Sequence, residues 1–118
     1  MSININDLLG VPYKDHGRTA AGYDCYGLAI EVERRYGKKL NDVYYNNHDI
    51  ELSAQNLPTL NLTPIDEPCE GAILEMELRG ALHIGVCLNR REFIHMTKNG
   101  CRVNQIGIIQ IRGIYGVN

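Results

Sequence analysis

The most regular hydrophobic pattern in the chain follows Cys25. From there, apolar side chains recur at the spacing of one helical face: Leu28, Ala29, Val32 and Tyr36. Charged residues occupy most of the remaining positions, and Gly37 follows where a helix commonly ends. The pattern therefore predicts an amphipathic helix that begins at Cys25 and ends near Gly37, with Cys25 in its first turn.

The second half of the chain alternates in the manner of β-strands. Ala81–Leu88 alternates cleanly, and His83 shares its side of the strand with small residues that would let another backbone come close. After a turn at 89–91, the residues 92–96 form a second predicted strand. If the connection is an odd-length loop of about three to five residues, His83 and His95 share a face and lie almost opposite each other.

Further elements complete an α+β pattern, in which helices come first and strands follow. Short helices are predicted at 1–9 and at 49–54, the second limited by Pro58. Tyr44 and Tyr45 lie in a polar stretch, where we expect them to pack under a loop and not to stack on a ligand. Additional strands are predicted at 72–76, at 101–104 after the hairpin turn Lys98-Asn99-Gly100, and at 108–115. We expect one domain spanning residues 1–118.

A cysteine at a helix start has distinctive chemistry. The unpaired N–H groups and the positive end of the helix dipole both favour a thiolate there. Cys25 is therefore a candidate nucleophile, although a small buried core residue is the alternative when this residue is considered alone. With His83 and His95, one imidazole could take the thiol proton while the second holds the first in the useful tautomer.

Four segments follow one another along most of the chain, from about Val11 to Met96: Pro12-Tyr13, Gly22-Tyr23-Asp24-Cys25-Tyr26-Gly27-Leu28, His83-Ile84-Gly85-Val86 and Phe93-Ile94-His95. In order and spacing they resemble the NlpC-type cell-wall peptidases. The resemblance implies a papain-like domain, with N-terminal helices and the nucleophile helix packed on an antiparallel β-sheet. It also implies a cysteine endopeptidase, a thiol protease that cuts peptidoglycan stem peptides between D-glutamate and a diamino acid.

The resemblance also implies a role for each site residue. Cys25 would be the nucleophile, His83 the general base and acid, and His95 the residue that orients His83. Tyr13 corresponds to the tyrosine beside the nucleophile, which positions the reacting carbonyl and its oxyanion.

Some positions depart from the family pattern, and they fall near the expected cleft. Tyr26 stands where many members have serine, which resembles the branch found in bacteriophage tails. Gly71-Ala72 replaces the usual Gly-Asp, and Lys14-Asp15-His16-Gly17 replaces an aromatic-Gly pair. Asp24 and Tyr26 flank the nucleophile and are candidate substrate-binding residues.

Composition excludes several classes of protein. The formal net charge is -2, so no nucleic-acid footprint or electrostatic membrane anchor is indicated. The basic residues Arg34, Arg35, Lys38 and Lys39 are interpreted as a solvated helix face. No stretch approaches the ~20 apolar residues of a membrane span, and the N-terminus does not have the pattern of a secretion signal.

The other cysteines and histidines have plainer interpretations. Cys69, Cys87 and Cys101 are expected to be buried thiols, while a zinc site formed with His83 and His95 is an alternative. Disulfides are possible but have no support from a signal peptide. His16 and His48 are interpreted as surface residues. We expect no metal and no organic cofactor.

These observations predict a cysteine peptidase that is a component of a bacteriophage or prophage tail. It would be made in the host cytoplasm and act on the cell wall from the virion tail, with peptidoglycan and other tail proteins as partners. Two alternatives remain: a tail assembly or adaptor protein with the same fold and little or no turnover, and a thiol-dependent amidase or acyltransferase. The isoleucines between Ile106 and Ile114 are either a contact surface for a tail protein or, the simpler interpretation, core residues of the last strands.

Overall fold

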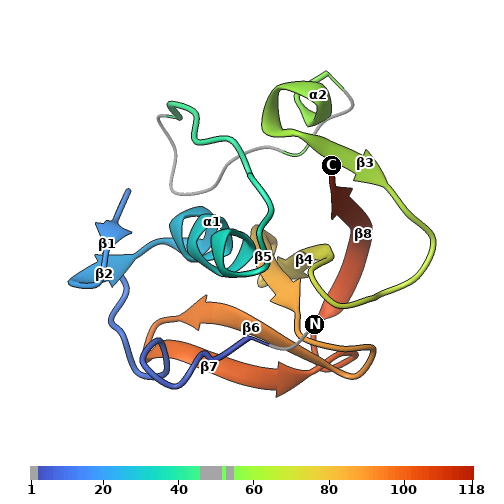
Figure 1. Cartoon of the computed structure of the whole chain (residues 1–118). Coiled ribbons are helices and arrows are strands. Elements are labelled where there is room, and N and C mark those ends of the chain that lie inside the picture. The colour runs from blue at the N-terminus through green and yellow to red at the C-terminus, as the bar shows by residue number, and fades with distance from the viewer. Residues whose placement is uncertain (1–2, 46–51, 53–54) are drawn as a thin grey trace.

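The computed structural model describes residues 3–45, 52 and 55–118. Two helices and eight strands follow one another along the chain (Figure 1): β1 Arg18–Thr19, β2 Gly22–Tyr23, α1 Cys25–Arg35, α2 Leu57–Leu60, β3 Leu62–Pro64, β4 Ile73–Leu78, β5 Ala81–Cys87, β6 Glu92–Thr97, β7 Gly100–Gln105 and β8 Gln110–Val117.

The main sheet has six antiparallel strands in the order β3-β8-β4-β5-β6-β7. Strands β4 to β7 are joined in chain order, and β8 returns to pair with β4 on the other side. The strands β1 and β2 form a separate small hairpin beside the start of α1, as Figure 1 shows. An antiparallel sheet with few helices is compatible with the predicted α+β class, and the four predicted strands from 72 to 104 are present.

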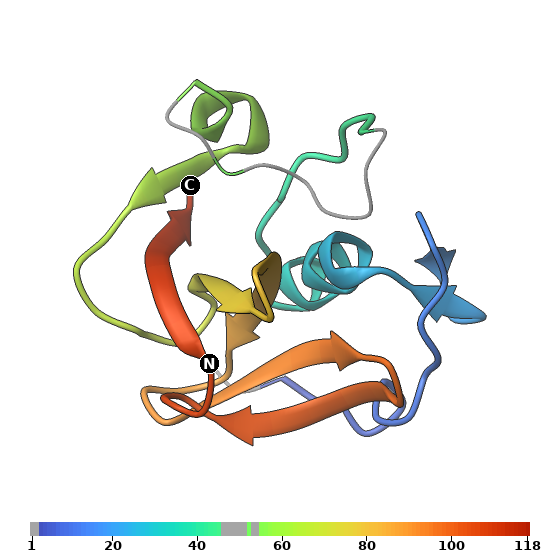
Figure 2. The same ribbon diagram turned by 180° about the vertical axis from the view of Figure 1, so that it is seen from behind.

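Helix α1 has the bounds that the sequence predicts. Asp24 caps its N-terminus by accepting a hydrogen bond from the backbone N–H of Gly27, and Gly37 adopts a positive φ of 78° just beyond its end. Its buried side chains, among them Leu28 and Val32, pack against the sheet in the larger hydrophobic cluster, which also includes Ile84. Figures 1 and 2 show α1 lying across β5 and above β6.

The opposite face of the sheet has a smaller core of five buried residues: Ala72, Leu74, Met76, Cys87 and Phe93. Neighbouring residues of one strand point to opposite faces, so Val86 belongs to the larger cluster and Cys87 to the smaller one. Partly buried isoleucines of the β7–β8 region, such as Ile109 and Ile111, pack on the smaller core. This agrees with the interpretation that these isoleucines are core residues of the last strands. Ile108 does not fit that interpretation, because it is 59% exposed.

The predicted N-terminal helix is wrong for the described residues. Residues 6–10 form turns, and Gly10 has a φ of 85°, which is incompatible with a right-handed helix. A segment this short gains little from local helix formation, whereas tertiary contacts stabilise the observed path. The N–H of Gly10 donates to the carbonyl of Cys101, and the N–H of Cys101 donates to the carbonyl of Val11. The segment thereby covers part of the edge strand β7, and Leu8 is buried.

The middle of the chain differs in smaller ways. The predicted helix at 49–54 lies outside the described residues, except for Leu52. The observed helix is the single turn α2, in which Pro58 occupies the first turn, where its missing N–H has no consequence. The small strands β1, β2 and β3 were not predicted. In the part of the chain that the structure describes, no helix is long and apolar enough to cross a membrane.

Candidate active site

Cys25 occupies the first position of α1, where the sequence places it. Its side chain is half-buried, and its Sγ lies 3.4 Å from Nδ1 of His83 on β5. Arg34 and Arg35 in the last turn complement the helix dipole at the other end. The thiol therefore combines an environment that favours negative charge with a nitrogen that can accept its proton.

His83 and His95 contact each other across neighbouring strands. Nε2 of His83 is 2.7 Å from Nδ1 of His95, and both rings are buried. In the β5–β6 register His95 is opposite Gly85, so His83 lies diagonally across on the same face. His83 and His95 therefore share a face of the sheet, as predicted. The segment between the paired residues Cys87 and Phe93 has five residues, an odd number.

Gly85 lies where the neighbouring strands approach closely. A Cβ at this position would meet the Phe93 ring at 2.8 Å, the terminal methyl of Met76 at 3.0 Å and the backbone oxygen of Ile94 at 3.2 Å. Side chains of β4 and β6 and the backbone of β6 therefore all come close to this side of β5. The Phe93 ring in turn packs at 4.5 Å from the His95 ring, which helps to fix that ring.

Burial controls the protonation of the two histidines. It lowers the pKa of His83 to about 4, with the neighbouring His95 as a second cause. Burial also lowers the pKa of His95, against an opposing effect of the hydrogen bond to Asn104. Both imidazoles are therefore neutral at physiological pH, which is the form that can accept a proton from a thiol.

Asn104 is a part of this arrangement that sequence reasoning missed. Its Oδ1 lies 2.7 Å from Nε2 of His95, so the polar chain runs from Cys25 through two histidines to β7. An asparagine in a predicted strand carries no distinctive signal. Only the pairing of β6 with β7, in which Phe93 is opposite Asn104, brings it near His95.

Tyr13 lies at the exposed edge of the site. It forms an isolated bridge with Tyr23 just before α1, and its side chain is partly exposed at 40%. Its hydroxyl donates a hydrogen bond of 3.3 Å to Oδ1 of Asp15. Burial raises the pKa of Tyr13 to about 12, and negative charge on Asp15 and Cys25 adds to this effect. The hydroxyl therefore keeps its proton and remains a hydrogen-bond donor near the thiol.

Asp24 and Tyr26 have structural positions, which corrects their predicted role in substrate binding. Asp24 is completely buried, and besides capping α1 it accepts hydrogen bonds from Arg18 and from the Tyr45 hydroxyl. Tyr26 is 2% exposed, and its hydroxyl donates to the carbonyl of Asn41. Neither side chain can contact a substrate without leaving these partners.

Arg18 joins three segments around the helix start. Its guanidinium donates to Asp24 at 2.9 Å, to the Asp42 carboxylate and to the Tyr45 hydroxyl. This approach requires Gly27, because a Cβ there would lie 2.2 Å from the carbonyl oxygen of Gly17. Tyr45 is thus packed as expected, whereas Tyr44 is 88% exposed, against the expectation.

The remaining cysteines lie in different environments. Cys87 and Cys101 are buried, and burial raises the pKa of each thiol to about 12. Cys69 is exposed, which corrects its expected burial. Among the described residues, no three Cys, His, Asp or Glu side chains are arranged to hold a metal ion, so the zinc alternative has no support there. His16 forms a hydrogen bond with the Tyr45 carbonyl through its Nε2, and His48 lies outside the described residues.

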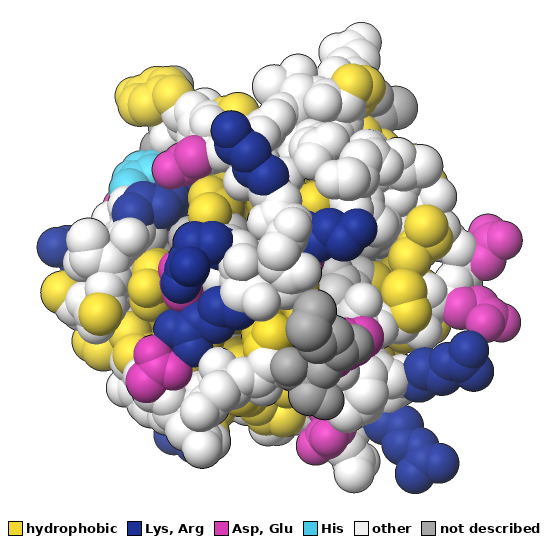
Figure 3. Space-filling model, viewed as in Figure 1, with side chains coloured by type: hydrophobic (Ala, Val, Ile, Leu, Met, Phe, Trp, Pro, Cys, Tyr) yellow, Lys and Arg dark blue, Asp and Glu magenta, His cyan; other side chains and the backbone are white. Residues whose placement is uncertain are grey.

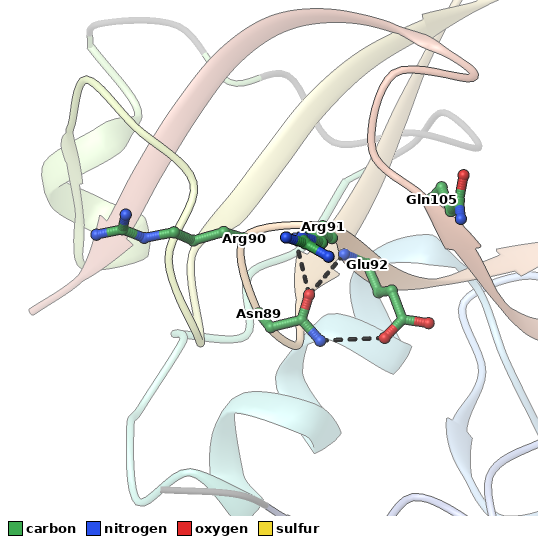
Figure 4. A pocket seen from close by; sticks show the side chains of 5 residues that line it. All are labelled: Asn89, Arg90, Arg91, Glu92 and Gln105. Carbon is green, nitrogen blue, oxygen red and sulfur yellow. Dashed lines mark hydrogen bonds between the residues drawn. The ribbon is translucent and has the colours of Figure 1, made fainter.

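A hollow beside the β5–β6 turn has no part in this site (Figure 4). It is lined by five residues: Asn89, Arg90, Arg91, Glu92 and Gln105. The Asn89 side chain accepts hydrogen bonds from the backbone N–H groups of Arg91 and Glu92, and so closes the turn. The hollow lies beyond the end of β5 that is farther from His83, and we assign it no chemical role.

Comparison with known proteins supports the assignment of the chain to a family. No curated protein gives a significant match. A model of the NlpC/P60 family matches residues 10–111, a segment that includes Cys25, His83, His95 and Asn104. This family generally comprises cysteine peptidases and other hydrolases, and it suggests a cell-wall peptidase. Because the match covers most of the sequence, the chain belongs to the NlpC/P60 family.

Proposed function

We propose that the protein is a cysteine endopeptidase that hydrolyses the stem peptides of peptidoglycan, at the amide bond between D-glutamate and a diamino acid. The observation that carries this proposal is the polar chain from Cys25 through His83 to His95, in a member of the NlpC/P60 family. The packing of α1 on the sheet, with the thiol at the helix start, supports a papain-like arrangement.

The reaction begins with a proton transfer. The thiol proton of Cys25 moves to Nδ1 of His83, and the resulting thiolate attacks the amide carbonyl carbon. Negative charge then develops on the carbonyl oxygen. The backbone N–H of Cys25 and the Tyr13 hydroxyl are the proposed donors to this oxyanion.

The second half of the reaction returns the protons. His83 gives its proton to the leaving amine as the C–N bond breaks, which leaves a thioester on Cys25. A water molecule then loses a proton to His83, attacks the thioester and releases the acid product with the thiol restored. His95 holds the His83 ring through both steps.

Digestion of purified peptidoglycan tests the proposal. The full chain is incubated with peptidoglycan whose stem peptides contain a diamino acid, and mass spectrometry identifies the new termini. We expect free D-glutamate carboxyl ends paired with new amines on the diamino acid, and no such ends with Cys25→Ala. Absence of new termini would contradict the peptidase proposal. If an amine is added to the digest, products joined to that amine would indicate an acyltransferase.

We also propose that the protein works in the tail of a bacteriophage or prophage and binds another tail protein there. Support comes from Tyr26 directly after the nucleophile, the feature that resembles the tail branch. Ile108 is 59% exposed beside the partly buried Ile109, which offers apolar surface for a contact. Pull-down from an induced lysate with the wild type and with Ile108→Ser tests this.

We expect a tail protein to be recovered by the wild type and lost with Ile108→Ser. Recovery of no tail protein, together with efficient lysis of intact cells by the added protein, would indicate a free-standing lytic enzyme. Recovery of a tail protein without any turnover of peptidoglycan would indicate the adaptor alternative.

A further inference from the structure

The polar chain at the candidate site extends one residue beyond the two histidines. Asn104 on β7 places its Oδ1 2.7 Å from Nε2 of His95. In the β6–β7 register Arg102 is opposite His95 and Asn104 is opposite Phe93, so Asn104 lies diagonally across from His95 on the same face. The three contacts of the chain measure 3.4, 2.7 and 2.7 Å.

This geometry gives the hydrogen bonds a direction. An amide oxygen only accepts, so Nε2 of His95 must carry the hydrogen. A neutral imidazole has one N–H, which leaves Nδ1 of His95 as an acceptor for Nε2–H of His83. Nδ1 of His83, the nitrogen that faces Cys25, is then without a hydrogen and can accept the thiol proton.

The opposite direction would disable the same three side chains. If a donor stood in place of the Asn104 oxygen, His95 would carry its hydrogen on Nδ1 and donate it to His83. Nδ1 of His83 would then already hold a hydrogen and could not act as a base. The group that meets Nε2 of His95 therefore decides between the two directions.

We propose that Asn104 is a positioning residue that fixes the tautomers of His95 and His83, and thereby leaves Nδ1 of His83 free to take the proton of Cys25. The proposal rests on the proposed function, since it concerns the base of that same reaction. Asn104 does not touch the thiol, and it acts through His95.

Nitrogen NMR of the histidine rings tests the tautomers without any substrate. Full-length protein with labelled histidine is compared with Asn104→Leu, which has the same branched shape but no acceptor, and with Asn104→Asp, which keeps the acceptor. Gln105→Leu is the matched control, because it removes an exposed amide from the next position of the same strand. Spectra are recorded at mildly alkaline pH, where both histidines are neutral.

In the wild type, Asn104→Asp and Gln105→Leu, we expect His95 and His83 to carry hydrogen on Nε2 alone. In Asn104→Leu we expect a second tautomer, with hydrogen on Nδ1, to appear in both rings. Alkylation of Cys25 by iodoacetamide should slow by about fivefold to tenfold in Asn104→Leu, the factor that loss of one hydrogen bond typically causes. The rate should return to within about twofold of the wild type in Asn104→Asp.

Two results would overturn the inference. One is a wild-type spectrum in which His95 carries its hydrogen on Nδ1, and the other is a wild-type tautomer pattern and alkylation rate in Asn104→Leu. If Asn104→Leu does not fold, the wild-type tautomers, together with the tautomers and alkylation rate of Asn104→Asp, still decide the matter. These readouts need no peptidoglycan, so failure of the proposed substrate and failure of this inference are distinguishable.

Discussion

Glu33 is a buried carboxylic acid on the face of α1 that packs into the protein, and it makes a strong prediction about stability. Its side chain is completely buried, and neither carboxylate oxygen has a hydrogen-bond partner among the residues that the structure describes. Burial raises the pKa of Glu33 to about 8, although the nearby charge of Lys38 acts in the opposite direction. The folded protein therefore holds this side chain neutral at pH values where the unfolded chain has lost the proton.

The sign and size of the effect follow from linkage. The folded-state pKa of Glu33 is about 8 and the ordinary value is 4.5, so the folded state binds an additional proton between these two pH values. The stability associated with the neutral carboxyl is fully present below pH 4.5 and is lost as the pH rises through 8. At about 1.4 kcal/mol per pKa unit, the free energy of unfolding falls by about 5 kcal/mol across this window.

Glu33→Gln removes the ionisation and keeps the shape of the side chain. Denaturant unfolding of the wild type and the variant, followed by circular dichroism at a series of pH values across the window, measures the difference in free energy. We expect similar stability at the acidic end and an advantage for Glu33→Gln that grows to about 5 kcal/mol at the alkaline end. Parallel pH profiles for the two proteins would refute the reasoning.

A matched control lies two residues earlier on the same helix. Glu31 forms ion pairs with Arg34 and Arg35, and the hydrogen bond from Arg34 is the largest cause that lowers its pKa. Its contribution to stability is therefore present above its ordinary pKa and is lost as the pH falls. Glu31→Gln should lower stability at neutral pH, which is the opposite sign to Glu33→Gln.

Further predictions concern the site and its surroundings. Iodoacetamide should alkylate Cys25 faster than the other three cysteines at neutral pH, and peptide mapping that shows equal labelling would contradict its role as nucleophile. His83→Ala should lower turnover of peptidoglycan by about 10²-fold or more, whereas His95→Asn, which keeps an acceptor, should be milder; the reverse order would mean that their roles are exchanged. Gly27→Ala should lower the melting temperature although alanine favours helices, because its Cβ would lie 2.2 Å from the Gly17 oxygen; an unchanged or higher value would contradict this steric account.

Charged and hydrophobic side chains are interspersed on the face that Figure 3 shows. Lys and Arg side chains lie there among Asp, Glu and hydrophobic groups. The basic residues at the end of α1 agree with this mixture, since Arg34 is exposed and paired with Glu31. This distribution accords with the small net charge of the sequence.

Helix α1 and strand β5 could be predicted from the sequence because their signals are local. The cap at Asp24, the spacing of the apolar residues and Gly37 all act within a few turns of one helix. Strict alternation likewise fixes the side of β5 on which His83 lies. The order of Cys25, His83 and His95, with its resemblance to a family, then indicated which of these residues belong together.

Only the tertiary structure decided which polar groups meet. Asn104 reaches His95 because of the β6–β7 register, and Arg18 reaches Asp24 because glycines let two segments approach closely. The N-terminal segment has a helical pattern of its own, yet hydrogen bonds to β7 give it a different path. Glu33 is of a residue type that is usually exposed, but it is completely buried. Register, close approach and burial depend on residues far apart in the chain, so local periodicity determined the elements while their packing determined the site.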